Sequence, residues 1–151
     1  MKIDSIRNGI VIDHITAGKA MKLYELLHLQ SVDASVAILM NVVSHKMGRK
    51  DIIKIDAEIP VDLDVIGYVD PGATVNFIRD EQLLEKKTIN LPDRLVNVIR
   101  CKNPRCITTT EQELPQIFHL SNREQKVYRC LYCESKAEPM SGPAPADDRV
   151  V

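Results

Sequence analysis

All four cysteines of this 151-residue chain lie after residue 100, and their spacing limits what the C-terminal third can fold into. The order is Cys101-x4-Cys106, then 23 residues, then Cys130-x2-Cys133. Short cysteine pairs at both ends of a small β unit are typical of a tetrahedral structural metal site, and four thiolates leave no open position for catalysis. We therefore predict one structural zinc ion per chain, because zinc is a likelier occupant of such a site than iron.

Two other interpretations of the cysteines stay open at this point. The four thiols could simply be buried, or Cys130-x2-Cys133 could be a redox pair. A redox pair normally opens a helix that follows a strand, and no such pattern surrounds this one. Metal binding is therefore favoured.

The segment around the cysteines is a small unit with β character. Short strands are predicted near residues 117–120 and 126–130, without helical periodicity. Residues 93–139 make a unit too small to fold readily without a staple, so the metal should supply much of its folding free energy. Leu91-Pro92 breaks the preceding pattern, so we predict domains at 1–92 and 93–139. The proline-rich residues 140–151 are expected to be a disordered tail.

The first 92 residues alternate between strand and helix patterns. The first strand, residues 10–15, alternates strictly, which would place Asp13 and His14 on opposite faces and Ile15 opposite Ile10. Thr16 is the expected cap of the first helix. Two helices against one antiparallel sheet make an α+β fold of the ferredoxin-like type, followed by the small all-β zinc-binding domain. The predicted elements are strand 10–15, helix 17–29, strands 35–43 and 50–57, a short helix with Pro60 in its first turn and Leu63, Ile66 and Val69 on its apolar stripe, and strands 73–78 and 82–89.

Composition excludes several classes of protein. Lys and Arg number 20 against 21 Asp and Glu, and this net charge of −1 gives no footprint for nucleic acid or a membrane surface. No apolar run of 18 residues predicts a membrane span, and Met1-Lys2-Ile3-Asp4 lacks the apolar core of a signal peptide. We expect a cytoplasmic protein, a location where cysteines more often bind metals than form disulfides.

Polar side chains in the predicted sheet suggest a ligand site. Folding could gather Asp13, His14, Lys54 and Lys86, and two lysines with a histidine suit a polyphosphate, while an aspartate suits ribose hydroxyls. From spacing alone, ordinary surface residues are the simpler interpretation, because lysines are common on half-solvated strands. No catalytic motif or phosphate loop is present, so a nucleotide would have to bind without one.

Six motifs stand in order along the chain, among them Gly9-Ile-Val-Ile-Asp-His-Ile15 and Met47-Gly-Arg-Lys-Asp-Ile-Ile-Lys-Ile55. The first is similar to the signature G-x-V-I-D-H-I of the aspartate carbamoyltransferase regulatory chain family, and the second resembles that family's second motif. The resemblance covers residues 3 to about 135, and six motifs in the right order identify the chain as a member. The other four are Ala73-Thr-Val-Asn76, Leu91-Pro92, the run from Val96 through Cys101-x-Asn-Pro-x-Cys-Ile-Thr108, and Cys130-x-Tyr-Cys133.

The resemblance implies a non-catalytic allosteric subunit in de novo pyrimidine biosynthesis. Its first domain would bind CTP, ATP and UTP as effectors, and its zinc domain would contact the catalytic chain. Homodimers of regulatory chains would bridge two catalytic trimers in a twelve-chain holoenzyme. That enzyme condenses carbamoyl phosphate with aspartate, typically with inhibition by CTP and activation by ATP.

The resemblance also assigns roles to individual residues. Asp13 matches the family aspartate near the ribose, His14 the histidine on the phosphate side, Lys54 the lysine contacting ribose and base, and Lys86 the lysine that holds phosphates. Glu81 stands where the family position is often aromatic. The other implied positions are Ile6 and Glu81, whose backbone groups would meet the base edge, Ile3, Asp4, Ser5, Val11, Asn76, Ile78 and Leu83 along the pocket, and Lys50 nearby.

An alternative of a different class is a zinc-ribbon regulator that binds nucleic acid. It would use the bases near the cysteines together with aromatic side chains. Neighbouring acids offset these bases, which weakens the case on charge grounds. The residues concerned are Lys102, Arg105, Arg123, Lys126, Arg129, Tyr128 and Tyr132.

Overall fold

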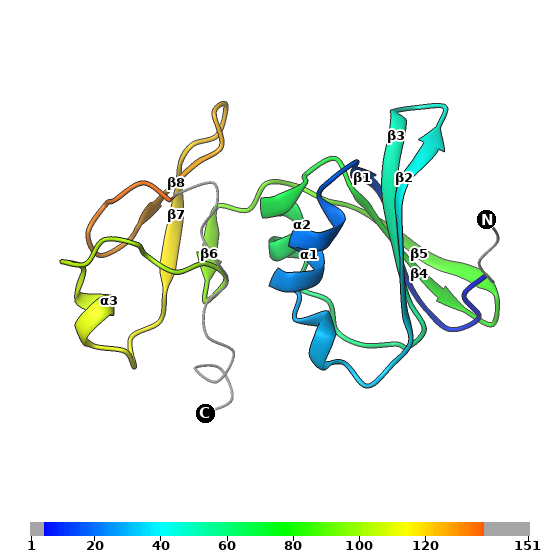
Figure 1. Cartoon of the computed structure of the whole chain (residues 1–151), viewed down its shortest axis with the longest axis horizontal. Helices are drawn as coiled ribbons and strands as arrows, with labels where there is room; N and C mark the ends of the chain where they lie inside the picture. Colours follow the sequence, from blue (N-terminus) through cyan, green and yellow to red (C-terminus); the bar gives the residue numbers. More distant parts are fainter. Residues whose placement is uncertain (1–4, 138–151) are drawn as a thin grey trace. The chain divides into compact units, whose positions relative to one another are not determined.

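A computed structural model describes residues 5–137, which divide into two compact units between Asn90 and Leu91 (Figure 1). The predicted tail at 140–151 lies outside the described residues, as do Ile3 and Asp4. No helix between residues 5 and 137 is long and apolar enough to cross a bilayer.

The N-terminal unit is a five-stranded antiparallel sheet with both helices on one face (Figure 1). The strand order is β2-β3-β1-β4-β5, which is the ferredoxin-like order with a fifth strand added beside β4. This confirms the predicted fold class. The elements are β1 (Gly9–Thr16), α1 (Ala20–Leu26), the 3-10 turn η1 (Leu29–Ser31), β2 (Val36–Ser44), β3 (Gly48–Ile55), α2 (Leu63–Val69), β4 (Thr74–Arg79) and β5 (Gln82–Thr88).

The core of this unit lies between the sheet and its two helices. Period-two alternation sends one set of side chains from the three central strands towards the helices, and these side chains are almost all aliphatic. The opposite face carries no helix, so its side chains are available to a ligand. The fully buried core residues are Ile10, Ile12, Ile15, Ala20, Leu23, Ile53, Ile55, Ile66 and Val75.

Helix α1 is shorter than predicted, and its cap is not Thr16. The helix begins at Ala20, and its N-cap residue Lys19 makes no side-chain cap. The carboxylate of Asp51 on β3 instead accepts hydrogen bonds from Gly18 N (2.9 Å) and Ala20 N (3.1 Å). The prediction was wrong because the acceptor comes from a distant strand, which local pattern does not indicate.

Helix α2 begins at Leu63, so Pro60 lies before the helix and not in its first turn as predicted. Asp62 caps it by accepting hydrogen bonds from Asp64 N (3.0 Å) and Val65 N (3.4 Å). The helix ends at Val69, just before the Pro71-Gly72 pair. The turn that follows it places β4 beside β1.

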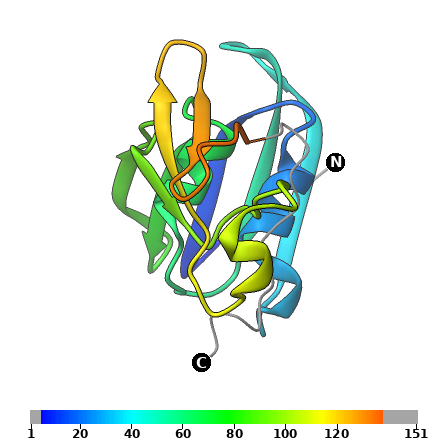
Figure 2. The same ribbon diagram turned by 90° about the vertical axis from the view of Figure 1, so that its left-hand side faces the viewer.

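The C-terminal unit is a three-stranded antiparallel sheet in the order β6-β7-β8 (Figure 2). The strands are β6 (Arg94–Val96), β7 (Ile117–Asn122) and β8 (Val127–Cys130). A single helical turn, α3 (Ile107–Thr110), which the periodicity does not predict, follows the first cysteine pair. The buried apolar residues of this small unit are Leu91, Leu95, Val98, Ile99, Phe118 and Tyr128.

Candidate functional sites

The four cysteines converge into one cluster. Their Sγ atoms all lie within 4.8 Å of one another, and none forms a disulfide. The Cys101–Cys133 and Cys106–Cys130 Sγ–Sγ distances are 3.6 and 3.7 Å. Four thiolates at zinc-like bond lengths of about 2.3 Å sit about 3.8 Å apart in a tetrahedron. The donor set and its geometry therefore fit a tetrahedral metal site.

The local backbone prepares these sulfurs for a cation. Burial raises the pKa of Cys130. The backbone N–H groups of Cys133 and Tyr132 donate to its sulfur and partly offset this rise. Burial opposes ionisation of Cys133 as well, but hydrogen bonds led by Ser135 and Asn103 outweigh it and lower the pKa of that thiol to about 6. The donors in the tight turns thus favour the thiolate of Cys133, whereas burial holds the pKa of Cys101 and Cys130 above the ordinary value.

A further hydroxyl lies against the cluster. Thr108 is buried, and its Oγ1 is 3.1 Å from the sulfur of Cys106. Such a contact orients a ligand from outside the coordination shell. The spacing of the cysteines does not indicate this residue, although its place two positions after a predicted ligand could have drawn attention to it.

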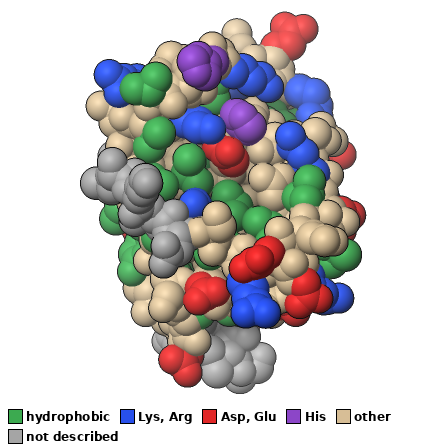
Figure 3. All heavy atoms as spheres, turned by 90° about the vertical axis from the view of Figure 1, so that its right-hand side faces the viewer, with side chains coloured by type: hydrophobic (Ala, Val, Ile, Leu, Met, Phe, Trp, Pro, Cys, Tyr) green, Lys and Arg blue, Asp and Glu red, His purple; other side chains and the backbone are tan. Residues whose placement is uncertain are grey.

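Most of the sequence-predicted ligand residues of the first unit gather on the helix-free face of the sheet. Lys54 pairs in register with Val11, Val11 with Asn76, and Asn76 with Lys86. Paired residues point to the same side of a sheet, so these four side chains form one row across β3, β1, β4 and β5. Ile78, paired with both Gly9 and Leu83, begins the next row. Figure 3 shows this face, where basic and histidine side chains gather over one half.

A β-bulge changes the expected directions of Asp13 and His14. Ile12 pairs with Ile53, but Ile15 pairs with Asp51, so two residues of β1 oppose one of β3. Ile15 is therefore fully buried on the same side as Ile12, and the strict alternation predicted for this strand was wrong. Asp13 and His14 were expected on opposite faces. The bulge instead brings both to the helix-free face.

Partners on the same face hold each bulged residue. The Asp13 carboxylate accepts from Lys50 Nζ at 2.9 Å, and His14 Nδ1 lies 3.0 Å from Thr74 Oγ1. His14 N also donates to Asp13 Oδ1 at 2.6 Å. Partial burial raises the pKa of Asp13, but the hydrogen bonds from Lys50 and His14 and the lysine charge outweigh it, and the pKa lies below its ordinary value.

Several polar groups on this face have no partner within residues 5–137. Neither Lys54 nor Lys86 forms an ion pair or side-chain hydrogen bond there. The Oδ1 atom of Asn76, between them in the row, is buried and likewise accepts no hydrogen bond. A buried amide oxygen without a donor is costly, so this group marks a place where a ligand donor fits.

The segment that contains Ile6 lies beside the turn that contains Glu81. Glu81 N donates to the carbonyl of Arg7 at 2.9 Å, and Asp80 N donates to Asn8 Oδ1 at 3.0 Å. Because the N–H of Glu81 is engaged, its carbonyl is the backbone group left for a ligand. Gly9 permits the close approach of this segment to the end of β3, since a Cβ at that position would lie 2.1 Å from the carbonyl oxygen of Ile55.

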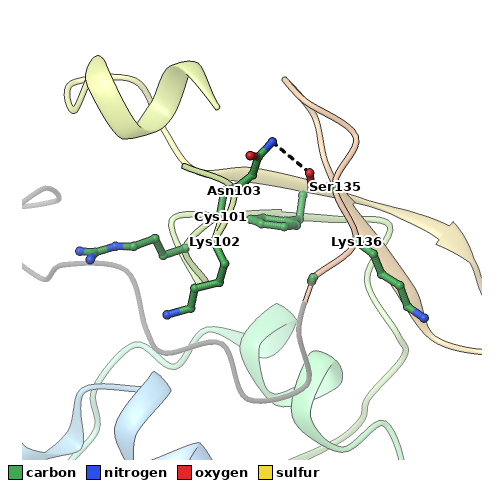
Figure 4. Close-up of a pocket in the computed structure, with 8 residues that line it drawn as sticks. Cys101, Lys102, Asn103, Ser135 and Lys136 are labelled. Atoms are coloured by element: carbon green, nitrogen blue, oxygen red, sulfur yellow. Dashed lines mark hydrogen bonds between the residues drawn. The ribbon is translucent and has the colours of Figure 1, made fainter. Parts of the chain in front are cut away.

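A hollow of about 250 Å³ lies beside the metal cluster. Figure 4 shows Asn103 bonded to Ser135 at its edge, with Lys102 and Lys136 extending on opposite sides. Arg100 also lines it, and none of the three cations has a carboxylate partner within the described residues. The sequence analysis did not identify this cationic hollow, because its members are spread from Arg100 to Ala137.

Comparisons with known proteins assign both units to one family. Residues 1–90 match the model of the aspartate carbamoyltransferase regulatory chain, allosteric domain, and residues 93–140 match its metal binding domain. The chain belongs to the aspartate carbamoyltransferase regulatory chain family. Regulatory chains of Clostridium tetani and Bifidobacterium longum are 49% and 46% identical to it over 135 and 138 residues. These matches cover 89% and 91% of this chain, and 94% and 99% of the relatives.

The family assignment confirms the resemblance on which the site residues were predicted. The chain is a regulatory rather than a catalytic chain of aspartate carbamoyltransferase, with an allosteric and a metal-binding domain. It accounts for the cysteine cluster as the metal site of the second domain. The interpretations of the cysteines as a redox pair and of the second unit as a nucleic-acid binder lose their support, because one family accounts for both units.

Proposed function

We propose that this regulatory chain binds CTP and ATP, with UTP as a further effector, on the helix-free face of its allosteric domain. The observation that carries the proposal is the row of Lys54, Val11, Asn76 and Lys86, in which two cations and an amide oxygen have no partner among residues 5–137. The lysines suit the phosphates and ribose, and the amide oxygen can accept from a base amino group. Asp13, whose carboxylate stays ionised, suits the ribose hydroxyls.

The metal of the second domain is proposed to be zinc, one ion per chain, in a structural role. Four thiolates at tetrahedral separations support zinc over hard cations, which prefer oxygen ligands. With all four positions taken by protein, the ion would hold the domain together and take no part in chemistry. Free thiols committed to a metal also fit a reducing, cytoplasmic compartment.

The metal-binding domain is proposed to contact the catalytic chain and transmit the effector signal to catalytic trimers. Its cationic hollow, in which Arg100, Lys102 and Lys136 have no carboxylate partner in the part of the chain that the structure describes, suits an acidic surface. Tyr132 and Ile107 lie next to cysteines in the sequence, and their side chains are 37% and 49% exposed. Exposed apolar and aromatic side chains of this kind suit an interface with another chain. The partner chain itself is expected from the names of the relatives.

Regulatory chains are further proposed to pair as homodimers that bridge two catalytic trimers in a twelve-chain assembly. Strand β2 is an edge of the five-stranded sheet and exposes Met40 and Val43 at 50% and 66%. A hollow of about 570 Å³ lies alongside, lined by α1, η1 and β2. An exposed apolar sheet edge of this kind is normally covered by another chain.

Calorimetric titration of CTP and ATP into the Lys86→Ala protein tests the nucleotide site. We expect both affinities to fall together by about tenfold or more, because a charge-assisted contact to phosphate contributes roughly 1.5–3 kcal/mol. Lys87→Ala is the matched control. Lys87 is the next residue, but it pairs with buried Val75 and lies over the Phe77 ring on the other face. Equal affinities in wild type and Lys86→Ala would refute the placement of the phosphates.

A further inference from the structure

Asp51 is a fully buried carboxylate that the nucleotide site does not use directly. Its side chain is 0% exposed on the helix-covered face of β3. Its Oδ1 accepts from Asn41 N on β2 at 2.8 Å. Its Oδ2 accepts from Gly18 N and Ala20 N, at 2.9 and 3.1 Å, in the segment that leaves β1. One carboxylate thus joins three chain segments through backbone donors.

Both strands that flank β3 are irregular beside this residue. On β1, Asp13 and His14 together oppose one residue of β3. On β2, Leu39 pairs with Ile52 and Val42 with Lys50, so that two residues of β2 oppose Asp51 alone. His14 and Asn41 have φ angles of 58° and 60°, a left-handed region that is uncommon for non-glycine residues, although His and Asn enter it more readily than most. The Asn41 N–H is satisfied by Asp51.

We propose that Asp51 is a positioning residue for the nucleotide site, holding the β1 bulge that directs Asp13 and His14 towards the ligand. The chain before the bulge is fixed by core pairing between Ile12 and Ile53. The chain after it is fixed by the pairing of Ile15 with Asp51 and of Thr16 with Lys50. Just beyond these residues, the Asp51 carboxylate accepts from Gly18 N and Ala20 N. The inference rests on the proposed nucleotide function.

The neighbouring residue extends the connection to the helix-free face. Lys50 precedes Asp51 on β3 and forms the ion pair with Asp13. A shift of this part of β3 would therefore move both the bulge and the cation that orients the Asp13 carboxylate. Asp70 also holds the end of β1, accepting from Thr16 N at 2.6 Å, so we expect Asp51→Asn to keep the strand attached and the domain folded.

The first test needs no ligand. In wild type, His14 N–H donates to the Asp13 carboxylate, so its amide hydrogen should exchange slowly with solvent. In Asp51→Asn we expect this exchange to speed up by about tenfold, as the bulge loosens. Lys87→Ala is the control and should leave it unchanged. Faster exchange at Gly18 and Ala20 alone, with His14 as protected as before, would overturn the proposal.

The second test is a double-mutant cycle with CTP. Asp13→Ala should weaken binding by about tenfold in wild type but only about twofold in Asp51→Asn, because the Asp13 carboxylate is already misdirected there. Lys86→Ala, two strands further along the sheet, should cost the same factor in both backgrounds. A general loss of stability in Asp51→Asn would change the effects of Asp13→Ala and Lys86→Ala on CTP affinity alike. Equal effects of Asp13→Ala in both backgrounds would contradict positioning by Asp51.

The outcomes separate the inference from the function on which it rests. A wild-type protein that binds no CTP would refute the nucleotide site, while the exchange experiment would still report whether Asp51 holds the bulge. If Asp51→Asn does not fold, Asp51→Ser, which is smaller and cannot clash, takes its place in both experiments. CTP binding with an additive cycle would refute the inference and leave the proposed function standing.

Discussion

Replacing Cys130 by serine should unfold the metal-binding domain and leave the allosteric domain intact. Cys130 is 0% exposed at the end of β8, and its sulfur lies 3.7 Å from that of Cys106. The serine oxygen is a poor substitute for a thiolate, and three sulfurs cannot complete the site. The other domain has its own core between five strands and two helices, so it should not depend on the metal.

The magnitudes decide the outcome for the metal-binding domain. A structural zinc ion contributes roughly 10–16 kcal/mol to folding, which is as large as the whole net stability of a typical domain, about 5–15 kcal/mol. The core here consists of six apolar side chains around a three-stranded sheet, so little net stability remains without the ion. We therefore expect more than half of the molecules to have an unfolded metal-binding domain at 25 °C.

Amide-resolved NMR with metal analysis provides the assay. Cys130→Ser should contain no bound zinc, and the dispersed signals of β6, β7 and β8 should collapse while those of β1 to β5 persist. Cys130→Ser should also bind CTP as wild type does. Dispersed signals from residues 94–130 in a metal-free Cys130→Ser protein would show that the metal does not hold the domain, and this reasoning would fail.

Three further changes test single features of the allosteric domain. Gly9→Ala should lower the urea midpoint and the free energy of unfolding, the latter by about 1–3 kcal/mol, because the new Cβ would lie 2.1 Å from a backbone oxygen. Gly72→Ala is the control, since its Cβ would have a nearest contact of 3.4 Å and should change the midpoint little. Equal midpoints for the two variants would refute the clash. Asp62→Ala should cost about 1 kcal/mol by removing the α2 cap, and an unchanged thermal midpoint would contradict it. The pKa of Asp13, read by carboxyl carbon NMR, should lie below 3.8 and rise in Lys50→Met. The ion pair between Asp13 and Lys50 therefore stabilises the fold at pH values above the unfolded pKa of Asp13, and this stabilisation is lost as pH falls through the folded pKa. The same Asp13 pKa in wild type and Lys50→Met would contradict this.

The sequence predicted most of the fold because its signals are local. Each of these signals depends only on residues close together in the sequence. Examples are the alternating runs at 50–57 and 73–78, the Asp80-Glu81 turn and the helix end before Pro71-Gly72. The cysteine spacing likewise predicted a cluster that the structure brings together, because each short pair occupies one turn.

The parts that sequence patterns missed depend on contacts between distant segments. The bulge at Asp13 and His14 is a property of pairing with β3, so strict alternation put Ile15 on the wrong face. Asp51 looks like an ordinary polar residue in a strand, yet it caps α1 across 31 positions of sequence. The cationic hollow beside the cysteines gathers residues from three separate segments, which no single motif contains.

The account rests most directly on a link between nucleotide binding in the allosteric domain and catalysis in the partner chain. The decisive measurement is the carbamoyltransferase rate against aspartate concentration, for catalytic chains alone and assembled with wild-type, Lys86→Ala or Lys87→Ala regulatory chains, with and without CTP. We predict that CTP displaces the curve only in the wild-type and Lys87→Ala assemblies, since a ligand acts only through unequal affinity for two states. An equal displacement in the Lys86→Ala assembly, or in catalytic chains alone, would contradict the account.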